Sequence, residues 1–167
     1  MYNQLTKSDI QKMEEEIEHR KCVVRKQLLE HVKEARAQGD LSENFEYYAA
    51  KKEKNRNESR IRYLERMIKT AKIVSEESKE DEVGLNNTVI LYFEEDKEVE
   101  TYKVVTTMRE DILNNKISKE SPLGRAIFGH KVNDRVFVKV NDQYGYYVVI
   151  QEIQKTGEEE GDTIRSF

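Results

Sequence analysis

Three carboxylate side chains recur at three-residue steps, at Asp40, Glu43 and Glu46. One explanation is a capping box, in which Asp40 accepts a hydrogen bond from the amide of Glu43 and the Glu43 side chain reaches back. The other is a site that holds two or three carboxylates together to bind a hard cation. The spacing alone favours the cap, because helix starts are common. The two explanations are compatible, since a carboxylate has several lone pairs.

Two long segments with helical spacing flank these acids. The first runs from about Leu5 to Gln38 without glycine or proline, and the second from about Ser42 to Val74. Gly39 supplies the positive φ that commonly ends a helix. Two helices joined by a short turn predict an antiparallel coiled-coil hairpin about 45 Å long, with the acids at its tip. Residues 51–60 contain no apolar side chain, so the packing should be weaker there.

The apolar residues of the second segment form its expected seam, and they recur at helical steps. They lie at both ends of the segment: Phe45, Tyr48 and Ala49 near the tip, and Ile61, Leu64, Ile68 and Ala71 at the other end.

Basic side chains are frequent on both segments. Residues 1–73 contain 17 lysines and arginines against 13 acids, whereas the whole chain has a net charge of −4. Such residues usually form a solvated helix face with weak ion pairs. Direct contact with RNA is the alternative, and the candidates nearest the acids are Arg36, Lys51, Lys52 and Arg56. Stable binding to duplex DNA by the chain alone is not expected, because the protein is acidic overall.

Composition narrows the remaining classes. The chain has 167 residues, of which 37% are charged, and it has a single cysteine, Cys22. One cysteine excludes an intrachain disulfide and a cysteine pair for zinc. No apolar stretch suits a signal peptide or a membrane span, so a soluble cytoplasmic protein is expected.

The second half of the chain has a different pattern. Residues 75–87 are acidic and end in turn-forming residues, which predicts a linker. Residues 88–154 contain four stretches with strand patterns, at about 88–93, 99–106, 135–140 and 146–153. Between the two pairs a short helix is expected, with Ser121 as its cap, Pro122 in its first turn and Gly129 at its exit. The result is an α+β domain, followed by a flexible acidic tail at 155–167.

These residues resemble the bacterial transcript-cleavage factors of the GreA/GreB type, closest to the GreA branch. The most specific match is residues 35–44 (ARAQGDLSEN) with Glu46 and Tyr47, and a second match is residues 117–129 (ISKESPLGRAIFG). Asn133 stands where the family has glycine before Asp134, and asparagine tolerates the left-handed conformation that glycine favours.

The resemblance implies a coiled-coil domain at residues 1–74 and an FKBP-like domain at residues 88–154. In that family the globular domain docks on bacterial RNA polymerase, and the coil enters the secondary channel of the enzyme. Asp40 and Glu43 would then help to hold a Mg²⁺ ion shared with the polymerase, where the nascent RNA 3′ end is cleaved. Ser42, Asn44, Glu46 and Tyr47 would support the tip. The protein would be a monomer that binds no cofactor alone and is not itself an enzyme.

Three other functions remain open. A paralogue that enters the same channel would inhibit synthesis without cleavage. A peptidyl-prolyl isomerase is suggested by fold analogy alone, and the chain has no tryptophan and no evident aromatic pocket. A coiled-coil scaffold would not need the carboxylates of Asp40 and Glu43.

Overall fold

The computed structural model describes residues 3–39 and 44–166. The chain divides into two compact units. One is formed mainly by Ser8–Ala71, and the other by Gln4–Lys7 together with Lys72–Ser166. Two short strands, β1 (Asn3–Leu5) and β2 (Ala71–Ile73), pair in a two-stranded sheet that the sequence patterns did not predict.

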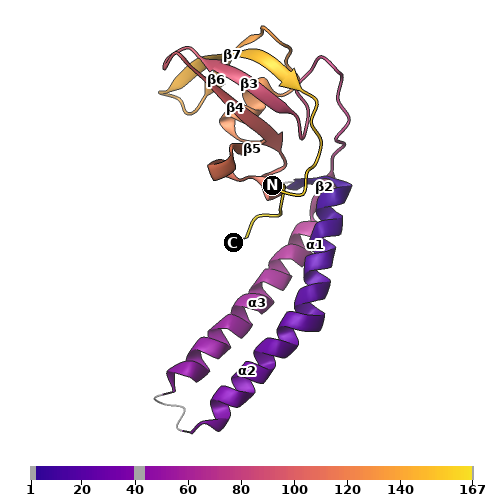
Figure 1. The fold of residues 1–167 in the computed structure, drawn as a ribbon, viewed down its shortest axis with the longest axis vertical. Helices are drawn as coiled ribbons and strands as arrows, with labels where there is room; N and C mark the ends of the chain where they lie inside the picture. Colours follow the sequence, from indigo (N-terminus) through magenta and orange to yellow (C-terminus); the bar gives the residue numbers. More distant parts are fainter. Residues whose placement is uncertain (1–2, 40–43, 167) are drawn as a thin grey trace. The chain divides into compact units, whose positions relative to one another are not determined.

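The first unit is an antiparallel helical hairpin, as predicted (Figure 1). One side consists of α1 (Lys7–His19), a π-helical turn η1 (Arg20–Val24) and α2 (Arg25–Ala37), which follow one another without a break. The other side is α3 (Phe45–Lys69), which packs against η1 and α2. The seam residues Ile61 and Leu64 are buried, as the helical spacing predicted.

Polar groups join the two sides in the middle of the hairpin, where weak packing was expected. The carboxylate of Glu16 accepts hydrogen bonds from Arg60, at 2.7 and 3.2 Å, and from Arg20, at 3.0 Å. Burial raises the pKa of Glu16, but its hydrogen bonds to Arg60 and Arg20 lower that pKa overall. Charge-assisted hydrogen bonds therefore take the place of apolar contacts here.

The π-helical turn lies beside this network. In this turn the Arg25 amide donates to the Arg20 carbonyl, five residues earlier in the chain. The side chain of Asn57 donates to the same carbonyl at 3.4 Å and accepts from the Arg20 guanidinium at 2.9 Å. Arg25 also forms a bidentate pair with Glu58, with distances of 2.7 and 2.8 Å. The extra residue in the turn thus coincides with a set of specific contacts to α3.

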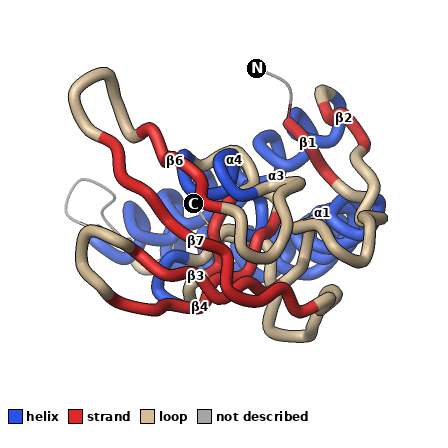
Figure 2. The backbone as a smooth tube through the Cα atoms, turned by 90° about the horizontal axis from the view of Figure 1, so that it is seen from above, coloured by secondary structure: helices blue, strands red, loops and turns tan. Residues whose placement is uncertain are grey.

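The second unit is built on a five-stranded mixed sheet, which confirms the expected α+β class. The strand order is β5-β4-β3-β7-β6, and only the β4–β5 pair is parallel. The strands are β3 (Thr88–Phe93), β4 (Glu98–Val105), β5 (Lys116–Ser118), β6 (Arg135–Lys139) and β7 (Gly145–Gln154). Figure 2 shows them in red, with the helix α4 (Pro122–Ile127) beside β6. Two single 3-10 turns, η2 (Thr107–Arg109) and η3 (Ile112–Asn114), precede β5.

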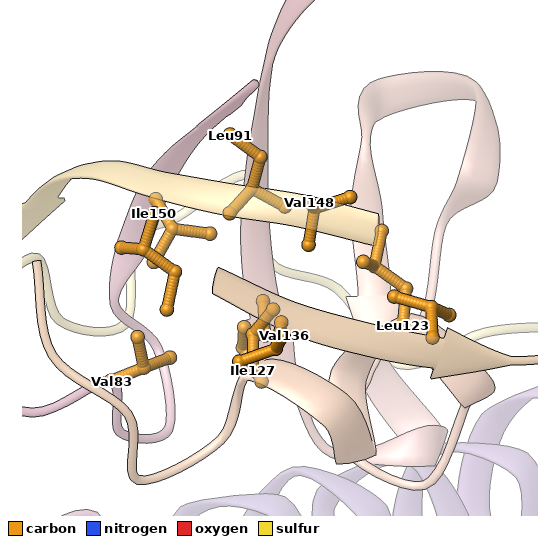
Figure 3. Close-up of a cluster of buried hydrophobic side chains, with 10 residues drawn as sticks. Val83, Leu91, Leu123, Ile127, Val136, Val148 and Ile150 are labelled. Carbon is orange, nitrogen blue, oxygen red and sulfur yellow. The ribbon is translucent and has the colours of Figure 1, made fainter. Parts of the chain in front are cut away.

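The core of this unit lies between the sheet and α4. Figure 3 shows Leu91, Val148 and Ile150 of the sheet on one side and Leu123 and Ile127 of α4 on the other. Strand β6 alternates as predicted, because Val136 and Val138 are buried while their neighbours are exposed.

The local signals around α4 are confirmed. The Ser121 hydroxyl accepts a hydrogen bond from the Gly124 amide at 3.0 Å and caps the helix, with Pro122 in its first turn. Gly129 has φ +80°, and Asn133 has φ +75°, the left-handed conformation that the sequence predicted asparagine would accept.

Two segments differ from the sequence-based expectation. Part of the predicted linker packs into the second unit, because Val83 belongs to its core. The tail from Lys155 was expected to be flexible, but Asp162 is 4% exposed and pairs with Lys103 and Lys116. The flexible-tail prediction is therefore wrong for this stretch. Two of its acids, Glu158 and Asp162, have basic partners that lie far away in the sequence.

Candidate functional site

The residues at the centre of the predicted chemistry, Asp40, Ser42 and Glu43, lie outside the part of the chain that the structure describes. The structure does describe the two helix ends that flank them. Helix α2 ends at Ala37, and the Gln38 amide donates to the Ala35 carbonyl at 3.3 Å. Gly39 has φ +122°, which confirms the predicted helix-ending glycine.

Asn44 is the N-cap of α3. Its Oδ1 accepts a hydrogen bond from the Tyr47 amide at 3.0 Å. The cap described for α3 is thus Asn44, and the capping box predicted for Asp40 and Glu43 lies outside the described residues. Asparagine caps helices as well as aspartate does, and Asn44 stands directly before the first helical residue.

The same side chain also joins the two helices. The Nδ2 group of Asn44 donates a hydrogen bond to the Ala35 carbonyl of α2, at 2.6 Å. This carbonyl also accepts the Gln38 amide, so the Asn44 side chain is its second hydrogen-bond donor. One side chain thus caps α3 and links the start of that helix to the end of α2.

Arg36 and Tyr47 form a second link across the tip. An Arg36 Nη2 donates to the Tyr47 hydroxyl at 3.2 Å, and the guanidinium carbon lies 5.5 Å from the centre of the Tyr47 ring. The hydrogen bond from Arg36 lowers the pKa of Tyr47. The structure therefore gives Arg36, a candidate for contact with RNA or polymerase, a contact within the hairpin.

Glu46, which was predicted to support the tip, and the three remaining contact candidates are exposed. Glu46 lies in the first turn of α3, and Lys51, Lys52 and Arg56 follow along the same helix. All four have exposed side chains, which leaves their charged groups accessible to solvent or to a partner.

Two aromatic residues at the tip differ from the expectation. Phe45 and Tyr48 were assigned to the seam of the hairpin, but Phe45 is 84% exposed and Tyr48 is 51% exposed. Helical spacing predicts that residues share a face, and it does not reveal whether another helix covers that face. The signal available in the sequence was the position of both rings in the first turn after a cap, close to several lysines.

The second unit contains a cavity of about 230 Å³ lined partly by Phe93, Tyr144 and Tyr146. The expectation of no aromatic pocket is therefore wrong. Four carboxylate residues share the lining, Glu95, Asp96, Glu98 and Glu100. This lining is more acidic than that of typical small-molecule sites, which are mostly apolar.

Within the described residues, no three histidine, cysteine or acidic side chains are grouped to hold a metal ion. Likewise, no helix of this part of the chain is long and apolar enough to cross a membrane.

Comparison with known proteins identifies both units. Residues 3–73 match the family model "Transcription elongation factor, N-terminal", and residues 77–155 match "Transcription elongation factor, GreA/GreB, C-term". Transcription elongation factor GreA of Thermoanaerobacter pseudethanolicus is 47% identical over 137 residues, which cover 81% of this chain and 87% of that protein. The GreA of Acholeplasma laidlawii is 46% identical, with coverage of 81% and 86%.

A solved structure gives a more distant match. GreA factor homolog 1 (Gfh1) of Thermus thermophilus is 27% identical, with a TM-score of 0.43 and coverage of 92% of this chain and 99% of that one. The two family models together span most of the sequence. This chain belongs to the GreA/GreB family of transcription elongation factors.

Proposed function

We propose that this elongation factor enters the secondary channel of bacterial RNA polymerase and stimulates the polymerase's own cleavage of backtracked nascent RNA. Asp40 and Glu43 are the residues that act there. The main support is the geometry of the two helix ends that flank them. Gly39 ends α2 with a positive φ, and on the other side Asn44 both caps α3 and bonds to the Ala35 carbonyl. The described residues on both sides of these acids thus have a defined geometry.

The donor set of the two acids fits the proposed ion. Each carboxylate offers oxygen ligands, which Mg²⁺ prefers, and Mg²⁺ usually takes only one or two carboxylates from a protein. Asp40 and Glu43 would hold the ion, and the polymerase and water would supply its other ligands. Bound there, the ion would orient an attacking water and offset negative charge at the reacting phosphate. The hairpin itself supplies position, which lowers the entropy cost of bringing the acids to the phosphate.

The reaction is hydrolysis of one phosphodiester bond of the RNA. Water adds to the phosphorus, and the bond from phosphorus to the 3′ oxygen of the upstream nucleotide breaks. That oxygen takes up a proton, which leaves a 3′ hydroxyl that the polymerase can extend. The factor is unchanged at the end and supplies no nucleophile of its own.

The test uses purified, backtracked polymerase complexes with Mg²⁺, in which release of short 3′ RNA fragments is followed. We expect Asp40→Asn and Glu43→Gln to reduce the cleavage rate by at least about tenfold while binding to the polymerase is retained, as competition with labelled wild-type factor shows. The exposed Glu53 gives a matched control, because Glu53→Gln also removes one carboxylate from the hairpin.

Other results would contradict the proposal. Full cleavage by the Asp40→Asn, Glu43→Gln double variant would show that the acids are not required. A wild-type factor that binds, cuts nothing and slows RNA synthesis would instead identify an inhibitory member of the family.

A further inference from the structure

Four residues share one exposed face of α3 next to the tip: Phe45, Tyr48, Lys52 and Arg56. They follow at steps of three, four and four residues, and such steps place side chains in a row along a helix. The row extends for about 16 Å at 1.5 Å per residue. All four side chains are exposed. The row begins with two aromatic rings and ends with two positive charges.

The two rings are not explained by the packing of the hairpin. Phe45 is 84% exposed and Tyr48 is 51% exposed. Tyr47, which lies between them in the sequence, contacts Arg36 of α2 instead. It also packs edge-on against Tyr48, with ring centres 5.6 Å apart and an angle of 61° between the planes. This contact supports one side of the Tyr48 ring and leaves a large part of that side chain exposed.

The chemistry of the row selects an anionic ligand with flat rings. Exposed aromatic side chains stack with nucleic-acid bases of any sequence, and lysine and arginine attract the phosphates between them. Single-stranded RNA has both features and exposes the faces of its bases. The acidic Glu46 and Glu53 lie about a quarter of a turn away around the helix, at 100° per residue, so they do not interrupt the row.

We propose that Phe45 and Tyr48 form a stacking platform for the bases of the extruded RNA 3′ segment, and that Lys52 and Arg56 contact its phosphates. This inference rests on the proposed function, which brings the tip to that RNA. It adds a role for two aromatic side chains that would hold the RNA beside the acids of the tip.

The experiment measures the factor concentration that gives half-maximal cleavage of backtracked complexes. We expect Phe45→Ala to raise this concentration about tenfold, because stacking on one base contributes an effect of roughly 5- to 150-fold. Phe45→Leu keeps an apolar side chain without an aromatic face and should behave like Phe45→Ala, whereas Phe45→Trp should preserve the wild-type value. Leu29→Ala is the control, because Leu29 is also exposed, at 46%, and lies on α2.

A second arm changes the RNA. Complexes are prepared in which the extruded nucleotides lack their bases but keep the sugar and phosphate groups. The wild-type factor should then require the same higher concentration as Phe45→Ala, and the substitution should cause no further loss. This coupling assigns the effect to the base and not to a contact between Phe45 and the polymerase.

Each contrary outcome has a separate meaning. A wild-type factor that cuts no RNA overturns the proposed function and this inference with it. If the wild type cuts normally and Phe45→Ala is unaffected, the stacking platform alone is overturned. If Phe45→Leu retains full activity, or if loss of the bases has no effect, the ring contacts protein and the inference is also wrong.

Discussion

Arg60 donates two hydrogen bonds to the carboxylate of Glu16 across the hairpin, at 2.7 and 3.2 Å, and the Arg60 side chain is only 2% exposed. A guanidinium buried to this extent loses most of its hydration and depends on its partners for compensation. Removal of one partner from such a pair is more damaging than replacement of both by apolar groups. The polar middle of the hairpin is therefore sensitive to single substitutions.

The first prediction concerns Glu16. Glu16→Ala should lower the free energy of unfolding by about 2 kcal/mol, because it leaves the Arg60 charge buried without this carboxylate. The value is below the range of about 3–5 kcal/mol for fully buried pairs, since the Glu16 side chain is 27% exposed. Urea denaturation followed by circular dichroism at 222 nm measures the change.

A matched control for Glu16 is available on the same helix. Glu15 pairs only loosely with Lys12, at 3.9 Å, and both side chains are more than half exposed. Glu15→Ala should change the free energy of unfolding by less than about 0.5 kcal/mol. Equal effects of the two substitutions would show that the buried network does not stabilise the hairpin.

The second prediction concerns the pH dependence that Asp162 confers. Burial raises the pKa of Asp162, but hydrogen bonds from Lys103 and Lys116 outweigh this effect and lower it to about 2. Because the folded-state pKa is lower than the unfolded value of about 3.9, the carboxylate stabilises the fold above pH 4. That contribution is lost as the pH falls from about 4 to 2. Thermal unfolding between pH 7 and pH 2 measures it.

Asp162→Asn should lower the melting temperature at pH 7 and weaken its dependence on pH between 4 and 2. The control is Asp142→Asn, because the side chain of Asp142 is 97% exposed and should contribute little. The anchored-tail interpretation fails if the two substitutions give the same pH profile.

Local signals in the sequence predicted much of the fold. Three of these signals are Gly39 as a helix end, Ser121 as a helix cap and the alternation of Val136 and Val138 in a strand. Each depends only on residues nearby in the sequence, and the structure agrees with all three. The role of Asp162 was missed because its partners, Lys103 and Lys116, precede it by more than forty residues. In the sequence, a run of acidic residues without an evident basic partner resembles a solvated tail. The basic partners of Asp162 become evident only in the tertiary structure.

The tip shows the same limit at closer range. Asp40 and Asn44 both have side chains that cap helices, so propensity alone did not decide between them. The hydrogen bond from Asn44 to the Ala35 carbonyl joins two helices, and no periodicity within one helix predicts such a contact. For Phe45 and Tyr48 the helical spacing was predicted correctly, but the predicted burial was wrong. Burial depends on which face of the helix its partner covers.

The third prediction separates the two roles of Asn44. Asn44→Asp keeps an oxygen that can accept from the Tyr47 amide but loses the Nδ2 donor to the Ala35 carbonyl. Asn44→Ala loses both. We expect Asn44→Ala to lower the free energy of unfolding by about 1 kcal/mol, the usual cost of a lost cap, and Asn44→Asp to have a smaller effect.

Cleavage of backtracked RNA should respond differently from stability. If the bond to Ala35 positions the segment that carries Asp40 and Glu43, both variants should reduce the cleavage rate at saturating factor, by about tenfold, because misplacement of a catalytic group by about 1 Å has large effects. Ser121→Ala is the matched control, since it removes a helix cap from the second unit and should reduce stability without this loss of rate. An Asn44→Asp factor that cleaves at the wild-type rate would show that the cap alone orients the tip, and that the link between the two helices has no part in the reaction.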